Sequence, residues 1–240
     1  MECAMIAPTR RRFLACLTAA AVVPVFRSGR ARAHGGDVLL CGGSTLAGGF
    51  GDLLVERMAA AGVSAHNAAR PATGLARPDY FDWIAHARTL AARHRPRGIV
   101  LMFGGNDGQS LKTDDGRWIR WEEEAAWSSA YRARIDALRT ALLPNGGPVV
   151  WIGYPIVRIP KLRRRLQRIN AIAREAMAAA PRATYVDTWS VLAPEGRFTD
   201  TLTIGGRRTR VRADDGIHLT VQGARLLAEQ VAPRILEAMA

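Results

Sequence analysis

Short apolar runs alternate with amphipathic helical segments along most of this chain. The five runs occupy residues 38–41, 63–67, 98–103, 149–152 and 183–187. Between and after them, apolar side chains recur every three or four residues, which is the spacing of one buried helix face. Parallel strands need crossover connections, and a helical crossover covers one face of the sheet. The alternation therefore predicts one α/β domain with a five-stranded parallel sheet that helices cover on both faces.

Turn residues and helix caps indicate where the expected helices begin and end. One helix is expected to begin near Pro78, and the last to begin at the N-cap Thr220, with Pro233 kinking or ending it. Residues 104–127 form the one long stretch without a clear helix or strand pattern, and they directly follow the strand at 98–103. Because ligands of parallel α/β sheets bind beyond the carboxyl ends of the strands, we expect a binding loop here.

The first 33 residues differ in pattern from the rest. Paired arginines at 10–12 precede an apolar stretch at 13–26 that is too short to span a bilayer comfortably as a helix. Ala31 and Ala33 then supply the small residues that a signal peptidase reads. The pattern predicts a twin-arginine-type signal peptide at 1–33 and a periplasmic or secreted domain at 34–240 with no integral membrane segment. An uncleaved N-terminal anchor is the alternative, and it also places the domain outside the cytoplasm.

Composition excludes several classes of protein. The chain is 48% hydrophobic and 23% charged, which is average for a globular protein and disfavours long disorder or a polytopic membrane protein. Cys41 is the only cysteine after residue 33, so residues 34–240 can form neither an intrachain disulfide nor a multi-cysteine zinc site.

Three separate segments carry side chains suited to acyl transfer. Ser44 follows the first strand across two glycines, so its hydroxyl is expected at the sheet edge. A serine needs a base to act as a nucleophile, and Asp215 and His218 lie three residues apart in a turn. Asp215 can accept the Nδ1 proton of His218, which leaves Nε2 free to take the serine proton. Asn106 follows the strand at 98–103, and its side-chain N–H can join the Ser44 backbone N–H around an oxyanion.

These segments resemble the signature blocks of the SGNH, or GDSL-like, hydrolase family, in the family's order. The blocks correspond to Gly42-Gly43-Ser44, Gly74, Gly104-Gly105-Asn106-Asp107 and Asp215-Gly216-Ile217-His218. Residues 73–75, 77–83, 106–109 and 186–189 further resemble an exported bacterial branch of this family. The resemblance implies a flavodoxin-like three-layer α/β/α sandwich that needs no metal and no cofactor. It also implies a catalytic triad of Ser44, Asp215 and His218, with an oxyanion hole formed by Ser44, Gly74 and Asn106.

Gly43 departs from the family pattern, which usually has Asp at this position. A carboxylate that would brace the nucleophile turn is therefore absent. We expect a looser turn with lower activity, or a degenerate enzyme whose cleft only binds. Asp107 is the residue expected to take over part of the bracing.

The substrate that the resemblance implies is an ester, such as an O-acetyl group on an envelope polysaccharide. Hydrolysis and acyl transfer pass through the same acyl-serine, so the residues leave both reactions open. Trp118, Trp121 and Tyr154 fall in segments expected near the crevice, where aromatic faces can contact a sugar ring or an acyl chain. Packing of the long loop is the alternative role of the tryptophans.

Charge supports a competing hypothesis of a different class. The chain has a formal net charge of +13, and cations concentrate on one predicted helix face and before the Asp215 turn. They are Lys161, Arg163, Arg164, Arg165, Arg168, Arg207, Arg208, Arg210 and Arg212. Clustered cations can hold an anionic cell-envelope polymer, so a degenerate SGNH domain that only binds is the alternative function. No nucleic-acid partner is expected for an exported protein.

Overall fold

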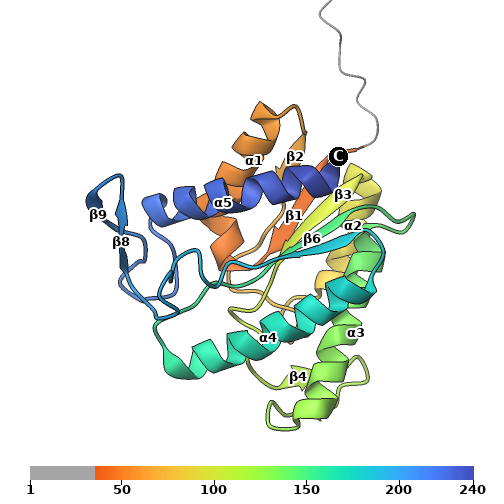
Figure 1. Ribbon diagram of the computed structural model, residues 1–240. Coiled ribbons are helices and arrows are strands. Elements are labelled where there is room, and N and C mark those ends of the chain that lie inside the picture. Colours follow the sequence, from red (N-terminus) through yellow and green to blue (C-terminus); the bar gives the residue numbers. More distant parts are fainter. Residues whose placement is uncertain (1–35) are drawn as a thin grey trace, which may run out of the picture. The chain divides into compact units, whose positions relative to one another are not determined.

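Five parallel strands form a central sheet within residues 36–240, the part of the chain that the computed structural model describes (Figure 1). The strands are β1 (Val38–Gly42), β2 (Ala65–Asn67), β3 (Gly98–Met102), β6 (Val149–Ile152) and β7 (Ala183–Val186). Their order is β2-β1-β3-β6-β7, and every neighbouring pair runs parallel. The predicted five-stranded parallel sheet is therefore confirmed, whereas the predicted signal peptide at 1–33 lies outside the described residues.

Helices cover both faces of the sheet and complete three layers (Figure 1). Side chains alternate along β1, so Val38 and Leu40 point to one face while Leu39 and Cys41 point to the other. The first face packs against the short π-helical turn η1 (Leu46–Phe50), α1 (Gly51–Ala60) and α5 (Val221–Met239). The second packs against α2 (Trp83–His94), α3 (Glu124–Leu142) and α4 (Pro160–Ala179). All residues of β1, β3 and β6 are buried, as expected for parallel strands between two helical layers.

The start of α2 differs from the sequence prediction. The helix begins at Trp83 rather than near Pro78, because Asp82 caps it. Asp82 Oδ1 accepts hydrogen bonds from the N–H groups of Ile84 and Ala85 at 2.9 and 3.0 Å. Asp is a strong N-cap residue, so the helix starts directly after it.

The start of α5 agrees with the prediction, and of the two effects predicted for Pro233 the structure contradicts one, the end of the helix at this residue. Thr220 is the N-cap as predicted, and its hydroxyl accepts a backbone hydrogen bond at 3.1 Å. The helix then continues through Pro233 to Met239. Proline removes one backbone hydrogen bond, and the burial of Val231 and Ile235 on either side stabilises the continuous helix in its place.

Two β-hairpins that the sequence patterns did not reveal follow the carboxyl ends of β3 and β7. The first pairs β4 (Leu111–Lys112) with β5 (Trp118–Ile119) inside the expected binding loop. The second pairs β8 (Thr201–Ile204) with β9 (Arg207–Arg210) just before the Asp215 turn. Gly205 and Gly206 have φ values of 55° and 77°, so this Gly-Gly pair is the sequence signal that identifies the second hairpin. No helix within residues 36–240 is long and apolar enough to cross a membrane.

Candidate active site

Ser44 lies at the carboxyl end of β1, where the strand turns into the first helical segment. Gly42 permits this turn, because a Cβ at its position would clash with the carbonyl oxygen of Met102 in β3. The carbonyl of Gly43 then accepts the first backbone hydrogen bonds of the helical turn. This backbone places the Ser44 hydroxyl oxygen 2.9 Å from His218 Nε2.

Asp215 holds His218 in a short turn that precedes α5. Asp215 Oδ2 lies 2.6 Å from His218 Nδ1, and Asp215 Oδ1 accepts hydrogen bonds from the N–H groups of Ile217 and His218 at 2.8 and 2.9 Å. Partial burial opposes ionisation of the carboxylate, but these hydrogen bonds outweigh it and lower the pKa of Asp215 to about 2. An ionised Asp215 accepts the Nδ1 proton, so Nε2 faces Ser44 as a proton acceptor.

Gly74 and Asn106 line one small cavity next to the nucleophile turn. The cavity has a volume of about 120 Å³, and its other walls are Ala72, Arg77, Tyr80 and Gln109. The Asn106 amide donates one N–H to the Thr73 carbonyl at 3.0 Å and retains a second N–H for a ligand. Gly43, the residue before Ser44, lies close to Thr73 and Asn106, because a Cβ built on it would be 3.1 Å from the Thr73 oxygen and 3.6 Å from Asn106 Nδ2. The nucleophile turn and the cavity are therefore neighbours.

Glycine at position 43 suits this close approach. A side chain there would press on the Thr73 carbonyl, so the Asp typical of the family would require the neighbouring loop to move. The nucleophile turn is braced instead by Thr45, whose Oγ1 lies 2.5 Å from the hydroxyl oxygen of Tyr154. Asn170 fixes Tyr154 by bonding its backbone N–H and C=O, each at 2.8 Å. The turn therefore has a brace even though the carboxylate is absent.

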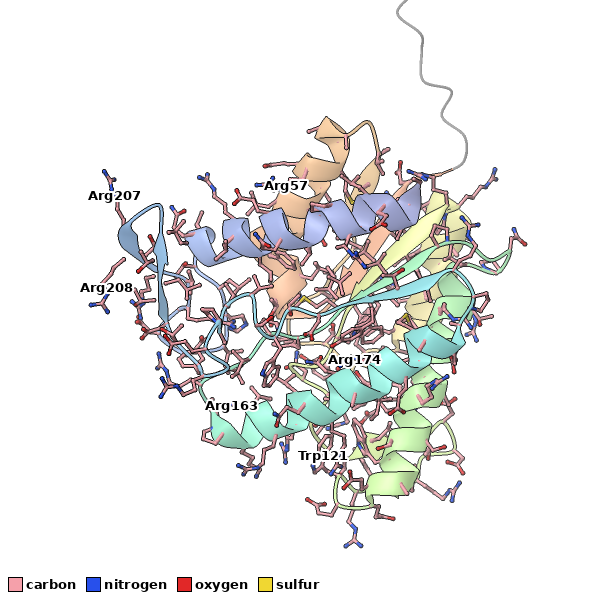
Figure 2. All side chains as sticks on the ribbon, viewed as in Figure 1. Arg57, Trp121, Arg163, Arg174, Arg207 and Arg208 are labelled. Atoms are coloured by element: carbon pink, nitrogen blue, oxygen red, sulfur yellow. The ribbon has the colours of Figure 1, made fainter. Side chains whose placement is uncertain are left out.

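The burial of Tyr154 corrects the prediction that it contacts substrate. The side chain is only 3% exposed, so its ring is closed off from the crevice. Trp121 is also engaged in packing, because it lies edge-to-face on Trp127 and under the Arg168 guanidinium, 4.2 Å from the ring centre. Figure 2 shows Trp121 next to α4. The alternative of loop packing therefore describes Trp121 best.

Trp118 lies in a different environment. It is 49% exposed, and the guanidinium carbon of Arg77 lies 4.9 Å from the centre of its ring. Arg77 also lines the cavity that holds Gly74 and Asn106. Of the three aromatic residues predicted to bind substrate, Trp118 is the exposed one, and its stacking partner Arg77 lines this cavity.

Long-range hydrogen bonds fix the loop that carries Gly74. Asp107 Oδ1 accepts a hydrogen bond from the Ala76 N–H at 2.9 Å, and a Cβ at Gly74 would clash with this carboxylate. Arg134 of α3 donates to the Leu75 carbonyl at 3.2 Å. Burial raises the pKa of Asp107 to about 6, although the bond from Ala76 opposes the shift. Asp107 therefore braces the Gly74 loop, which corrects the expectation that it braces the nucleophile turn.

Arg212, predicted to belong to a surface cluster of cations, is instead a buried structural residue. It is fully buried, and it donates to the carbonyls of Ile217 and Ile156 at 3.0 and 2.6 Å. Burial lowers its pKa to about 10, while Tyr154 and Asp215 oppose the shift. Arg212 thus ties the Asp215 turn to the segment after β6, and no sequence signal separates it from its exposed neighbours.

Other members of the proposed cationic surface also have intramolecular partners. Arg163 donates to the carbonyls of Val157 and Arg158, and ion pairs join Arg168 to Glu124 and Arg210 to Asp214. Arg207 and Arg208, at the tip of the β8–β9 hairpin, have no acidic partner within 4.0 Å in the described part of the chain (Figure 2). Lys161, Arg164 and Arg165 likewise have no acidic partner within 4.0 Å among residues 36–240.

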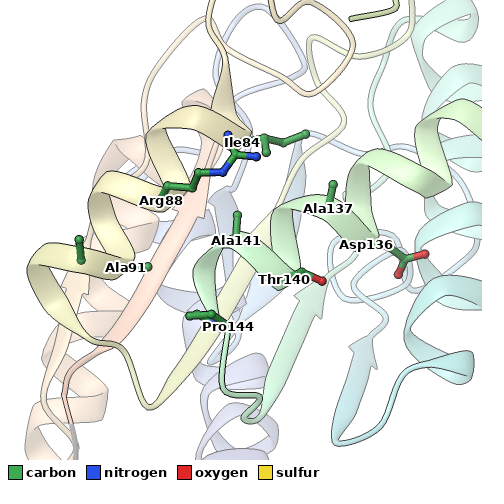
Figure 3. Close-up of a pocket in the computed structure, with 9 residues that line it drawn as sticks. Ile84, Arg88, Ala91, Asp136, Ala137, Thr140, Ala141 and Pro144 are labelled. Atoms are coloured by element: carbon green, nitrogen blue, oxygen red, sulfur yellow. The ribbon is translucent and has the colours of Figure 1, made fainter.

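A wider groove lies between α2 and α3 and lacks a nucleophile and base pair (Figure 3). It has a volume of about 770 Å³, and its walls are mostly small side chains, including Ala91, Ala137 and Ala141. Within residues 36–240, no group of three or more His, Cys, Asp or Glu side chains is placed to hold a metal ion. The Ser44 region is therefore the candidate active site.

Comparisons with known proteins agree with this architecture. A family model described as "Protein of unknown function (DUF459)" matches residues 37–234. A search of curated protein sequences gives no match. Solved structures share the fold at low sequence identity, among them the following three.

The first is a chain from Slackia heliotrinireducens proposed to be an SGNH hydrolase, with 16% identity, a TM-score of 0.55, and coverage of 84% of this chain and 100% of that one. The second is a carbohydrate esterase of family 3 from Talaromyces cellulolyticus, with 13% identity, a TM-score of 0.53, and coverage of 84% and 96%. The third is a catalytic mutant of an acetylxylan esterase from Geobacillus stearothermophilus, with 15% identity, a TM-score of 0.54, and coverage of 85% and 94%.

The predicted three-layer sandwich is the architecture that these structures share with residues 36–240. At such identities the likeness concerns the fold. The chain therefore belongs to the DUF459 family, and its fold is that of the SGNH hydrolases.

Proposed function

We propose that this protein is a serine esterase that uses Ser44, His218 and Asp215 to hydrolyse or transfer an acyl group. The observation that carries the proposal is the series of two short contacts, 2.9 Å from Ser44 Oγ to His218 Nε2 and 2.6 Å from His218 Nδ1 to Asp215. Nucleophile, base and orienting carboxylate are the three parts that acyl transfer to serine requires. The shared fold with carbohydrate esterases supports the same conclusion.

In the acylation step, the Ser44 oxygen attacks the ester carbonyl carbon while His218 Nε2 takes the hydroxyl proton. The N–H groups of Ser44 and Gly74 and the Asn106 amide donate to the resulting oxyanion, and each such donor typically contributes about 10²–10³ in rate. The tetrahedral intermediate then expels the alcohol oxygen, which takes the proton from His218. Asp215, with its low pKa, stabilises the imidazolium without itself becoming protonated.

In the second step, an incoming hydroxyl group attacks the acyl-serine while His218 removes its proton. Ser44 leaves and recovers that proton. Water as the incoming group gives hydrolysis, and a sugar hydroxyl gives acyl transfer. Ser44 and His218 also line a cavity of about 130 Å³ together with Gly48, Gly49 and Val221. The small volume of this cavity favours a short acyl group such as acetyl.

The proposed substrate is an O-acetyl ester on an envelope carbohydrate or a small ester, met in the periplasm or outside the cell. Support comes from the fold shared with an acetylxylan esterase and from the export signal predicted at 1–33. N-terminal sequencing of the protein from the periplasmic fraction tests the location, with His34 expected as the first residue. Replacing Arg10 and Arg11 with Lys should block export.

Reaction with a fluorophosphonate tests the nucleophile without knowledge of the substrate. Intact mass should show one adduct on the unchanged chain and none on Ser44→Ala or His218→Ala. Ser64→Ala is the matched control, because the Ser64 hydroxyl donates to Asp37 at 2.5 Å and has no histidine partner among the described residues. The control should label like the unchanged chain. An adduct that persists in Ser44→Ala, or no adduct on folded protein, would contradict the proposal.

Binding of an anionic polymer without catalysis is the second candidate function, and Arg207 and Arg208 favour it. Both are exposed at the hairpin tip and lack an acidic partner within residues 36–240. Arg207→Glu with Arg208→Glu separates the candidates. A binder should lose its retention on a polyuronate column, whereas an esterase should keep its fluorophosphonate adduct.

A further inference from the structure

Exposed aromatic side chains gather beside the cavity that holds Gly74 and Asn106. Tyr80 lines this cavity and is 69% exposed. Trp118 is 49% exposed and lies under Arg77, another residue of the cavity wall. We call Arg77, Tyr80 and Trp118 the aromatic shelf. Tyr80 and Trp118 are the two aromatic side chains among the large hydrophobic residues that are exposed in the described part of the chain, and both adjoin Arg77 or the cavity that it lines.

Ion pairs and cation–π contacts fix Arg77 and Trp118 although both face solvent. Arg77 donates two hydrogen bonds to the Asp79 carboxylate, each at 2.9 Å, and Lys112 Nζ lies 3.6 Å from the same carboxylate. The cationic groups of Arg77 and Lys112 lie 4.9 and 5.5 Å from the centre of the Trp118 ring. Side chains that are fixed before binding lose little conformational entropy when a ligand arrives. The Arg77 and Trp118 part of the shelf is therefore preorganised.

The shelf is also tied to the Gly74 loop. Arg134 donates to the carbonyls of Lys112 and Leu75, at 2.6 and 3.2 Å. The Lys112 N–H in turn donates to the Ala76 carbonyl at 3.0 Å. A ligand held on the shelf would therefore keep a constant position relative to the Gly74 N–H, as a group attached to the reacting ester requires.

We propose that the aromatic shelf binds a neutral pyranose ring that carries the ester. The proposal rests on the proposed function and gives it a substrate class, a neutral carbohydrate ester. The C–H face of a pyranose packs on aromatic rings, and its hydroxyl groups need polar partners such as the Gln109 amide in the same cavity. Asp79 already occupies the guanidinium fork of Arg77, so this fork is not free for a substrate carboxylate. A neutral sugar therefore fits better than a uronic acid.

Kinetics on two acetyl esters test the proposal in the full chain. Acetylated xylohexaose carries sugar rings, and 4-nitrophenyl acetate does not. Trp118→Ala and Tyr80→Ala should each lower kcat/KM about tenfold more for the oligosaccharide than for the nitrophenyl ester, through KM, whereas Tyr80→Phe should keep most of the sugar preference. Ile204→Ala removes an exposed aliphatic side chain on the other hairpin, 37% exposed, and is the matched control. Equal losses on both esters would overturn the proposal.

Binding measurements separate failure of the shelf from failure of the proposed function. The Ser44→Ala chain should bind at least one of xylohexaose, cellohexaose and chitohexaose by calorimetry, and adding Trp118→Ala should weaken that binding about tenfold. Hexagalacturonate should bind less tightly than the neutral oligosaccharide. The shelf proposal is overturned if no neutral oligosaccharide binds or if binding survives Trp118→Ala. Intact sugar binding without turnover or fluorophosphonate adduct would overturn the proposed function alone.

Discussion

The two sides of Ser44 are built in different ways. On the base side, the hydrogen bonds of the Asp215 carboxylate are local in sequence, because each goes to Ile217 or His218. The turn as a whole is tied to Ile156 through Arg212. The Asp215 and His218 side chains are 43% and 45% exposed. The oxyanion side is buried and long-range, because its loop is held by Asp107 and Arg134, which lie 31 and 59 residues from their partners.

This difference matches what each side has to do. A proton-transfer pair needs correct mutual orientation, which a short turn can supply from its own backbone. Oxyanion donors have to stay in place while charge develops on the substrate, which favours a rigid and buried support. Substitutions of the exposed side chains Asp215 and His218 should therefore lower activity with little loss of stability, whereas substitutions on the Gly74 side should change both.

The largest effect is expected from Asp215→Asn. The amide would favour the wrong histidine tautomer, so kcat should fall by about 10⁴. The melting temperature should change little, because the turn is exposed. Turnover of 4-nitrophenyl acetate and thermal unfolding measure the two quantities. A loss below about tenfold would show that the Asp215 contact does not set the tautomer.

Asn106→Ala comes next, and it should lower both activity and stability. Loss of one oxyanion donor should reduce kcat by about 10²–10³. The Thr73 carbonyl also loses its hydrogen bond, which should cost about 1 kcal/mol of unfolding free energy. Asn145→Ala, in an exposed turn, is the control for removal of an amide. A variant with full turnover would remove Asn106 from the oxyanion hole.

The same contrast explains what could be predicted from the sequence. Ser44, Asp215 and His218 stand in short local patterns, and the structure brings them together as expected. The apolar runs likewise predict the parallel sheet. The bracing roles of Tyr154 and Arg212 could not be predicted from the sequence. Each of these side chains bonds a residue that lies far away along the chain and comes close only after the helices pack. The sequence pattern does not show how deeply the segment after β6 is buried, so it predicts a substrate contact for Tyr154 where the structure has a buried brace.

Asp107→Asn tests the buried side through pH. Burial raises the folded-state pKa of Asp107 from 3.8 to about 6. Between about pH 4 and pH 6 the unfolded chain therefore loses a proton that the folded chain keeps, so this group makes stability fall as pH rises, by about 3 kcal/mol in total. The amide cannot ionise and should abolish the decrease. Urea unfolding at pH 4, 5, 6 and 7 measures how the unfolding free energy depends on pH. If this free energy changed with pH in the same way in both chains, the raised pKa of Asp107 would be refuted.

The smallest effect is expected from Tyr154→Phe. Tyr154 contacts the nucleophile turn through Thr45, between the base side and the oxyanion side of Ser44. The variant removes the hydroxyl bonded to Thr45 and leaves the contact between Ser44 and His218 untouched. Unfolding free energy should fall by about 1 kcal/mol, and kcat should fall by less than about tenfold, because the turn loosens without losing a reacting group. Thr45→Val should give a similar loss, and the double variant should lose less than the sum of the two. Strictly additive losses would mean that the two hydroxyls do not act as one brace, and the bracing of the nucleophile turn would then have to come from its backbone alone.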